Sequence, residues 1–291
     1  MNNLLGRVID TKMTDENEKY YFLQNSGSVF QLDKAEQVEP LHIGGHFKGF
    51  AYENEDHKLQ ITSKIPKIPK IQIGRMGFGT VVQSRRDLGV FVNIGLPNKD
   101  IVVSLDELPT IKSLWPQKGD RLMVSLSLDN KNRLWANLAD ETTFQEISQP
   151  APKTMKNQNL KATVYRLKLV GTLVITSDYY LGFVHPDERE QEPRLGEEVS
   201  ARVIGIHPDG TLNLSLKPRS YEAIGDDAAM LLALLQHNED HSLPFTDKSD
   251  PAAIKTEFGI SKGQFKRAVG HLLKAGVITE TKTELKLKTE E

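Results

Sequence analysis

The middle of the chain carries two short β motifs in a set order, Gly79-Thr80-Val81 and then Leu88-Gly89-Val90-Phe91-Val92. The same order returns as Ala162-Thr163-Val164 and Val170-Gly171-Thr172-Leu173-Val174. In both copies twelve residues separate the second motif from the next predicted strand, counted from Phe91 to Val103 and from Leu173 to His185. A weaker copy extends from Gly6 to Lys64. A spacing that persists while most side chains change predicts one small β module used three times.

Each copy is predicted to consist of five short strands. In the middle copy Leu122, Val124 and Leu126 recur with a period of two, which buries one face of a sheet, and Gly119-Asp120 supplies turn residues before them. Five short strands separated by turns are typical of a small Greek-key barrel of the oligonucleotide-binding (OB) type. The predicted fold class is therefore multidomain and mainly β, with three tandem five-stranded OB-fold barrels at 1–64, 72–140 and 153–219.

Two proline-containing junctions separate the copies. They are Ile65-Pro66-Lys67-Ile68-Pro69-Lys70-Ile71 and Gln149-Pro150-Ala151-Pro152-Lys153. Each proline lacks a backbone donor and pushes the preceding residue to extended geometry. Both junctions are predicted to be extended spacers between barrels.

After Arg219 the apolar period becomes helical. A first helix is predicted to start near Asp226-Asp227, whose charges favour a helix N-terminus, and a second covers 250–258 with Pro251 just inside its start. Ser261 and Gln264 form a predicted capping box for a third helix ending near Gly276. Two strands are predicted at 277–279 and 285–287. This order predicts an α+β winged helix-turn-helix domain at 224–289. The predicted apolar helix faces are Ala228, Leu231, Leu232, Leu234 and Leu235, and Phe265, Val269, Leu272 and Leu273.

Composition limits the function classes. The 291 residues carry no cysteine, which excludes disulfides and thiolate zinc sites, and the start of the chain does not resemble a signal peptide. We therefore expect a soluble, cytoplasmic protein that needs no membrane. The net charge is only −2, but 57–86 and 147–177 contain no acidic residue and many basic ones. Such segregation creates positive surface, unless these lysines simply solvate linkers.

Strand parity predicts where the aromatic side chains point. If Val90 and Val92 fill the barrel, then Phe91 lies on its outer surface. The same parity places Phe183 and His185 of the third copy outside, and Phe30 of the first copy is interpreted as the equivalent of His185. Exposed rings on such a barrel stack on unpaired bases. A parity shifted by one residue would instead make these rings core residues. Trp115 and Trp135 are interpreted as packing residues.

The motifs Gly89-Val90-Phe91-Val92, Gly182-Phe183-Val184-His185-Pro186 and Leu212-Asn213-Leu214-Ser215-Leu216-Lys217 resemble the RNA-binding module of ribosomal protein S-one. Three such modules before a winged helix resemble the conserved virulence factor B family of bacterial RNA-binding regulators. The resemblance implies RNA binding and regulation of gene expression, and it assigns base stacking to Phe91, Phe183 and His185. Neither copy has a full set, because Leu173 occupies one aromatic position and Ile101 and Val103 are aligned with Phe183 and His185.

Basic residues supply predicted phosphate contacts. On the barrels these are Arg85, Arg86, Arg166, Lys168, Lys217 and Arg219, and on the third helix of the winged-helix domain they are Lys262, Lys266, Arg267 and Lys274. A helix so rich in cations fits phosphates or a groove, although winged helices also dock proteins.

The sequence favours a non-enzymatic protein that binds single-stranded RNA and needs no cofactor or metal. It has no phosphate-binding loop with its lysine and no nucleophile elbow. Two alternatives stay open: a DNA-binding transcriptional regulator that uses the winged helix, and a scaffold that docks to a ribosome or a ribonuclease. Preference for duplex DNA would favour the first alternative, and failure to bind any RNA would favour the second.

Overall fold

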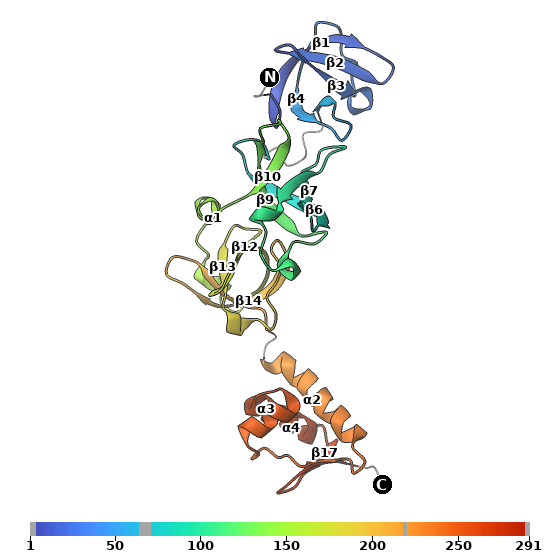
Figure 1. Ribbon diagram of the computed structural model, residues 1–291. Coiled ribbons are helices and arrows are strands. Elements are labelled where there is room, and N and C mark those ends of the chain that lie inside the picture. The colour runs from blue at the N-terminus through green and yellow to red at the C-terminus, as the bar shows by residue number, and fades with distance from the viewer. Residues whose placement is uncertain (1–3, 64–70, 218–219, 289–291) are drawn as a thin grey trace. The chain divides into compact units, whose positions relative to one another are not determined.

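The structure is a computed structural model that describes residues 4–63, 71–217 and 220–288. The chain divides into two compact units, Met1–Leu216 and Lys217–Glu291. Within these described residues, the first unit holds three closed five-stranded barrels and the second holds three helices with a small sheet (Figure 1). This architecture confirms the predicted fold class.

All three barrels share one topology. In each, the third strand pairs in parallel with the fifth, and antiparallel pairs close the rest of the barrel. The barrel orders are β1-β2-β3-β5-β4, β10-β8-β7-β6-β9 and β11-β12-β13-β15-β14. The strands of barrel 1 are β1 (Arg7–Glu16), β2 (Tyr20–Asn25), β3 (Ser28–Asp33), β4 (His46–Glu53) and β5 (Leu59–Thr62). Those of barrel 2 are β6 (Gly77–Arg85), β7 (Gly89–Asn93), β8 (Ile101–Ser104), β9 (Arg121–Leu128) and β10 (Leu134–Leu138). Those of barrel 3 are β11 (Asn159–Lys168), β12 (Gly171–Thr176), β13 (Leu181–Val184), β14 (Glu198–Ile206) and β15 (Leu212–Ser215).

Inward aliphatic side chains fill each barrel. Val90, Val92 and Val103 are fully buried in barrel 2, and Val174 and Val184 are fully buried in barrel 3. Side chains of a strand alternate between its two faces, so these buried positions send their neighbours outward. The core of each barrel therefore determines which residues are left for its outer surface.

A helix, rather than a spacer alone, connects barrels 2 and 3. Helix α1 (Glu141–Ile147) begins at Asp140, whose carboxylate accepts a hydrogen bond from the Thr143 amide at 2.8 Å. Phe144 of α1 is 2% exposed and stacks on Tyr165 of β11 with ring centroids 4.0 Å apart. It packs in one cluster with Met123 of barrel 2 and Ile175 of barrel 3.

The predicted extended spacer at 149–153 is therefore wrong in part. Ala151 is buried in the core of barrel 3, its amide donates to the Gly210 carbonyl at 3.1 Å, and a 3-10 turn, η4, follows at Lys153–Met155. The prolines prevent an α-helix here, as expected, but the segment packs on the barrel instead of standing free. The other predicted spacer, 65–71, lies outside the described residues except for Ile71.

Backbone hydrogen bonds also join barrels 2 and 3 directly. The Arg121 amide donates to the Gly196 carbonyl at 2.8 Å, and the Leu195 amide donates to the Leu114 carbonyl at 3.0 Å. The guanidinium of Arg194 forms two bonds of 3.2 Å to the nearly buried carboxylate of Asp120. A charged pair with this geometry and little solvent contact is stronger than an exposed one.

The second unit has the winged-helix order. Helices α2 (Ser220–His237), α3 (Pro251–Phe258) and α4 (Lys262–Lys274) pack on a three-stranded sheet in the order β16-β18-β17. The strands are β16 (Ser242–Leu243), β17 (Ile278–Glu280) and β18 (Leu285–Leu287). The capping box of Ser261 and Gln264 is confirmed.

Three details of the second unit differ from expectation. Helix α2 starts at Ser220 rather than near Asp226, and β16 was not foreseen because two residues are too short to show a period. Leu234 and Leu273, predicted on apolar faces, are 37% and 38% exposed. The buried stripes consist of Ala228, Leu231 and Leu235 in α2, and Phe265, Ala268, Val269 and Leu272 in α4.

Replacement of Phe144 tests the joint between barrels 2 and 3. We expect Phe144→Ala to lower the free energy of unfolding of this unit by about 3 kcal/mol, because the substitution leaves a cavity where a buried ring stood. Urea unfolding followed by tryptophan fluorescence measures the change, since both tryptophans lie in barrel 2. Ile147→Ala in the same helix is the control, because Ile147 is 38% exposed. Equal stability of Phe144→Ala and wild type would contradict this packing.

Candidate nucleic-acid interface

A row of outward side chains crosses three neighbouring strands of barrel 2. Phe91 of β7 lies opposite Val102 of β8, which lies opposite Trp135 of β10. All three are partly exposed, whereas Val90, Val92 and Val103 beside them are buried. The predicted outward position of Phe91 therefore agrees with the structure, and the row forms an apolar strip on the outer surface.

The strand register identifies the same row in the other two barrels. In barrel 3 it consists of Leu173, Phe183 and Asn213. In barrel 1 it consists of Phe22, Gln31 and Gln60. Phe183 is partly exposed and His185 is exposed, as expected from parity.

The interpretation of Phe30 is wrong. Phe30 is 1% exposed and lies in the core of barrel 1, so it cannot offer its ring to a base. The register places Gln31, not Phe30, opposite Phe22, and Asp33 at the strand end where barrel 3 has His185. The sequence alignment equated Phe30 with His185, three residues away from the true equivalent, Asp33. A shift by an odd number of residues moves a side chain to the opposite face of its strand.

The alignment of Ile101 and Val103 with Phe183 and His185 is also wrong. Ile101 and Val103 are buried, and the register equates Val102 with Phe183. The interval between the paired positions is eleven residues in barrel 2 (Phe91 to Val102) and ten in barrel 3 (Leu173 to Phe183). The equal interval of twelve in the sequence therefore concealed a connection that is one residue longer in barrel 2.

The third strand of each barrel ends in a capped 3-10 turn. The caps are Asp33, Ser104 and His185, and each side chain accepts a hydrogen bond from the backbone amide two residues on. In barrel 3 this cap holds His185 Nδ1 at 3.2 Å from the Asp187 amide. The His185 ring then meets the Phe183 ring edge to face, with centroids 6.4 Å apart. The two rings form one aromatic corner on the outer surface.

Glycine makes room for the Phe183 ring. Gly171, with φ of +152°, lies directly beneath that ring, and a Cβ there would come within 2.4 Å of a ring carbon. Only glycine combines this backbone conformation with such a close approach. The glycine at position 171 therefore helps to fix the position of the Phe183 ring.

Trp135 was interpreted as a packing residue, and the structure places it in the outer row instead. Its indole N–H donates to Asp129 Oδ2 at 3.3 Å, and the Arg133 guanidinium carbon lies 5.9 Å from its ring centroid. The Arg133 amide and side chain both donate to Asp129, and these bonds hold the pKa of that carboxyl well below its usual range. Counting alternate positions from the buried Leu134 and Ala136 finds Trp135 on the outer face. Trp115, by contrast, is 7% exposed and does pack in the core.

The corresponding surface of barrel 1 is partly covered by barrel 2. Gln60 is 4% exposed and accepts hydrogen bonds from Asn54 at 3.0 Å and from Asn98 of barrel 2 at 2.9 Å. The Tyr52 hydroxyl donates to Asn98 at 2.7 Å, and burial raises the pKa of this phenol. Barrel 1 therefore uses the Gln60 end of this surface as a contact with its neighbour.

Several predicted phosphate-binding cations are paired with carboxylates. Glu141 of α1 lies 2.7 Å from Lys168 and 3.7 Å from Arg166 on barrel 3. Arg85 pairs with Asp87 at 2.8 Å, while Arg86 is exposed. Lys217 is exposed at the end of barrel 3, and Arg219 lies outside the described residues. Such exposed pairs add little stability, so the carboxylates mainly reduce the local positive potential.

Helix α4 displays the predicted cations of the winged-helix domain. Lys266, Arg267 and Lys274 are exposed and Lys262 is partly exposed. The Lys266 ammonium lies 3.3 Å from Asp247. The buried face of α4 packs on α2 and α3, so the charged face is the one left for solvent.

Within 4–63, 71–217 and 220–288, no group of three histidine or acidic side chains could hold a metal ion. None of the helices in those ranges is long and apolar enough to cross a membrane.

Comparison with protein-family models gives four matches along the chain. Residues 5–64 match an S1 domain, 76–137 match the CvfB first S1-like domain, 144–218 match the second domain of virulence regulatory factor CvfB, and 229–287 match a CvfB-like winged helix domain. These domain types bind nucleic acids and are typically non-catalytic.

Whole-chain comparisons agree. Conserved virulence factor B of Staphylococcus epidermidis is 41% identical over 87% of this chain and 84% of that protein. The protein YitL of Bacillus subtilis, described as uncharacterized, is 37% identical over 94% of this chain and 90% of that protein. A crystal structure described as a multidomain protein with nucleic acid binding domains from Streptococcus pneumoniae is 47% identical, covers 99% of both chains and gives a TM-score of 0.72.

Fluorescence quenching tests the placement of Trp135. We expect acrylamide to quench wild-type emission strongly and Trp135→Phe emission weakly, because the remaining Trp115 is 7% exposed. Trp115→Phe is the matched control and should retain the strong quenching. Strong quenching of Trp135→Phe would contradict the placement of the two indoles.

Proposed function

This chain belongs to the conserved virulence factor B family, and on that premise we propose that it is a non-enzymatic protein that binds single-stranded RNA in the cytoplasm. It acts as a post-transcriptional or general regulator of gene expression, including that of virulence factors. The name of the matched family, a virulence regulatory factor, supports the regulatory part of the proposal.

The observation that carries the proposal is the exposed aromatic surface of barrels 2 and 3. Phe91 and Trp135 flank Val102 on one barrel, and Phe183 meets His185 on the other. Unpaired bases stack on such rings with about 1–3 kcal/mol per base, and the contact tolerates sequence variation because every base has a flat face. Bases in a duplex are already stacked, which is why the proposal specifies single strands.

Two incomplete sites act together in this proposal. Each barrel has fewer aromatic side chains than a full set, so each alone binds weakly. Helix α1 and the backbone bonds between barrels 2 and 3 join the two sites. Binding of one strand by the second barrel is then intramolecular, and the combined affinity exceeds that of either site.

Basic residues complete the proposed interface. Arg85, Arg86, Arg166, Lys168, Lys217 and Arg219 neutralise phosphates of the bound strand, and Lys262, Lys266, Arg267 and Lys274 of the winged helix add further contacts. Phosphate contacts release counterions, so affinity falls as salt concentration rises, with a slope of about −0.7 per contact in a log–log plot for single strands.

Removal of two rings tests the proposal. We expect Phe91→Ala/Phe183→Ala to weaken binding of a uridine oligonucleotide at least tenfold, because two stacking platforms are lost. Fluorescence anisotropy with labelled RNA at several salt concentrations measures the affinity. Phe22→Ala on the partly covered surface of barrel 1 is the matched control and should leave the affinity within twofold.

Other outcomes favour the alternatives. Unchanged affinity of the double variant would reject the aromatic surface as the RNA site. Tighter binding of duplex DNA than of single-stranded RNA would favour a winged-helix transcriptional regulator. Failure of the wild-type protein to bind any RNA at low salt would favour a scaffold that docks to ribosome or ribonuclease.

Replacement of Glu141 should strengthen RNA binding rather than weaken it. We expect Glu141→Gln to tighten RNA binding about threefold at low salt, because the substitution removes the carboxylate that pairs with Arg166 and Lys168 and leaves both cations for phosphates. The gain should shrink at high salt. Glu146→Gln, an exposed position on the same helix, removes the same charge elsewhere and serves as control. Equal gains in both variants would mean that only net charge matters.

A further inference from the structure

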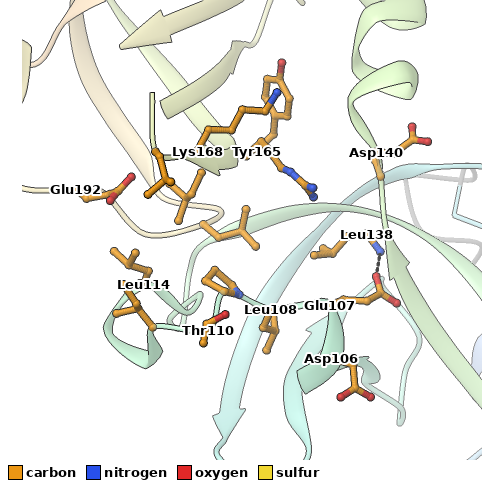
Figure 2. A pocket seen from close by; sticks show the side chains of 17 residues that line it. Asp106, Glu107, Leu108, Thr110, Leu114, Leu138, Asp140, Tyr165, Lys168 and Glu192 are labelled. Atoms are coloured by element: carbon orange, nitrogen blue, oxygen red, sulfur yellow. Dashed lines mark hydrogen bonds between the residues drawn. The ribbon is translucent and has the colours of Figure 1, made fainter. Parts of the chain in front are cut away.

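A cavity of about 700 Å³ opens between barrels 2 and 3, outside the aromatic rows. Its walls come from the 106–114 segment after β8, the end of β10, the β11–β12 hairpin and the segment before β14 (Figure 2). The size is that of a site that holds several side chains or a small ligand. Barrel 2 and barrel 3 both contribute, so the cavity exists only when the two are joined.

The lining of the cavity is apolar at its centre. Leu108 and Leu195 are 9% and 6% exposed, and Leu114, Leu138 and Leu167 lie partly buried beside them. Figure 2 shows Leu108, Leu114 and Leu138 between the acidic side chains of the opposite walls. These leucines offer a surface against which an apolar group could be buried.

Two large apolar side chains on the lining are exposed to solvent. Ile111 is 60% exposed, and Leu169 at the tip of the β11–β12 hairpin is fully exposed. Single exposed apolar residues are ordinary, but two beside an apolar cavity form a patch of the kind that marks an interaction site.

The charge of the lining is predominantly acidic. Four carboxylates line the cavity, those of Asp106, Glu107, Asp140 and Glu192, against two cations, Arg166 and Lys168. Both cations already face Glu141, and of the four carboxylates Glu192 pairs with Arg189 at 3.0 Å. Glu107 is held in place by a hydrogen bond from the Leu138 amide at 2.6 Å (Figure 2) and by one from the Asn137 side chain at 3.0 Å. These two bonds fix the position of the Glu107 carboxylate on the cavity wall.

We propose that this cavity binds a peptide segment of a partner protein, with an apolar residue seated among the leucines and lysine or arginine residues beside it. The leucines and the exposed Ile111 and Leu169 bury the apolar residue, and Asp106, Asp140 and Glu192 face its basic neighbours. Opposite charges across an interface speed association and set the register, while burial at the centre provides most of the affinity.

The acidic lining argues against RNA as the occupant. A phosphate backbone entering the cavity would approach four carboxylates, and like charges across an interface are unfavourable. RNA can still bind the aromatic row of barrel 3, because Arg166 lies opposite Leu173 of that row as well as at the edge of the cavity. The peptide site is therefore separate from the proposed RNA site but adjoins it.

The test uses two model peptides and the full chain. One ten-residue peptide alternates leucine and lysine, and a matched one alternates leucine and glutamate. Methyl NMR spectra of the leucine- and isoleucine-labelled protein are recorded with each peptide and with a uridine oligonucleotide. We expect the lysine peptide to shift the methyl signals of Leu108, Ile111, Leu114 and Leu169, and the glutamate peptide to leave them unchanged.

Variants at exposed positions avoid the problem of misfolding. We expect Ile111→Ser/Leu169→Ser to weaken the lysine peptide at least tenfold, and Asp106→Asn/Glu192→Gln to weaken it about threefold or more. Val38→Ser/Ile43→Ser, two exposed apolar positions of barrel 1, is the control and should change nothing. RNA affinity of the Ile111→Ser/Leu169→Ser variant should equal that of wild type, which separates this proposal from the proposed RNA function.

Three results would overturn the proposal. They are the absence of shifts at these methyl groups, equal binding of the lysine and glutamate peptides, and full peptide affinity in the Ile111→Ser/Leu169→Ser variant. Shifts at the same methyl groups with the uridine oligonucleotide alone would reassign the cavity to RNA.

Discussion

The alternation of side chains along each short strand is the constraint on which the rest of the structure depends. A closed five-stranded barrel is filled by aliphatic side chains such as Val90, Val92 and Val103, and every one of them sends its neighbour outward. The outer row of Phe91, Val102 and Trp135 is thus a consequence of filling the interior. The same strands serve both roles: their inward side chains stabilise the barrel, and their outward side chains form the candidate interface.

The three barrels use one topology for different purposes. In barrels 2 and 3 the outer row combines partly exposed rings with Val102 or Leu173, whereas in barrel 1 a single partly exposed ring, Phe22, lies beside Gln31 and Gln60. Gln60 is covered through its hydrogen bond from Asn98 of barrel 2. Barrels 2 and 3 are joined through Phe144 and through the pair of Arg194 and Asp120. Their junction also creates the acidic, apolar-centred cavity, so the connection between modules adds a surface that no single module has.

The face of a strand on which a side chain lies was predictable from its neighbours in the sequence. The correspondence between residues of different strands was less predictable. Phe91 and Phe183 are outward as their buried valine neighbours require. Ile101 and Val103 were misplaced because the interval from a residue of the second strand to its partner on the third is eleven residues in barrel 2 and ten in barrel 3. Phe30 was misplaced by three residues, of which the nine-residue interval of barrel 1 accounts for one. A one-residue change in a turn costs little in the turn itself, yet it reverses every side chain that follows.

The sequence by itself determined the local features of this protein: the three five-stranded modules, the capped helices of the winged-helix domain, and the inward or outward direction of residues beside a buried valine. These depend on periodicity and on hydrogen bonds between residues a few positions apart. Only the tertiary structure decided that Glu141 pairs with Arg166 and Lys168, that Gln60 is covered, and that α1 buries Phe144. Those contacts join residues far apart along the chain, and short-range patterns do not encode which distant surfaces meet.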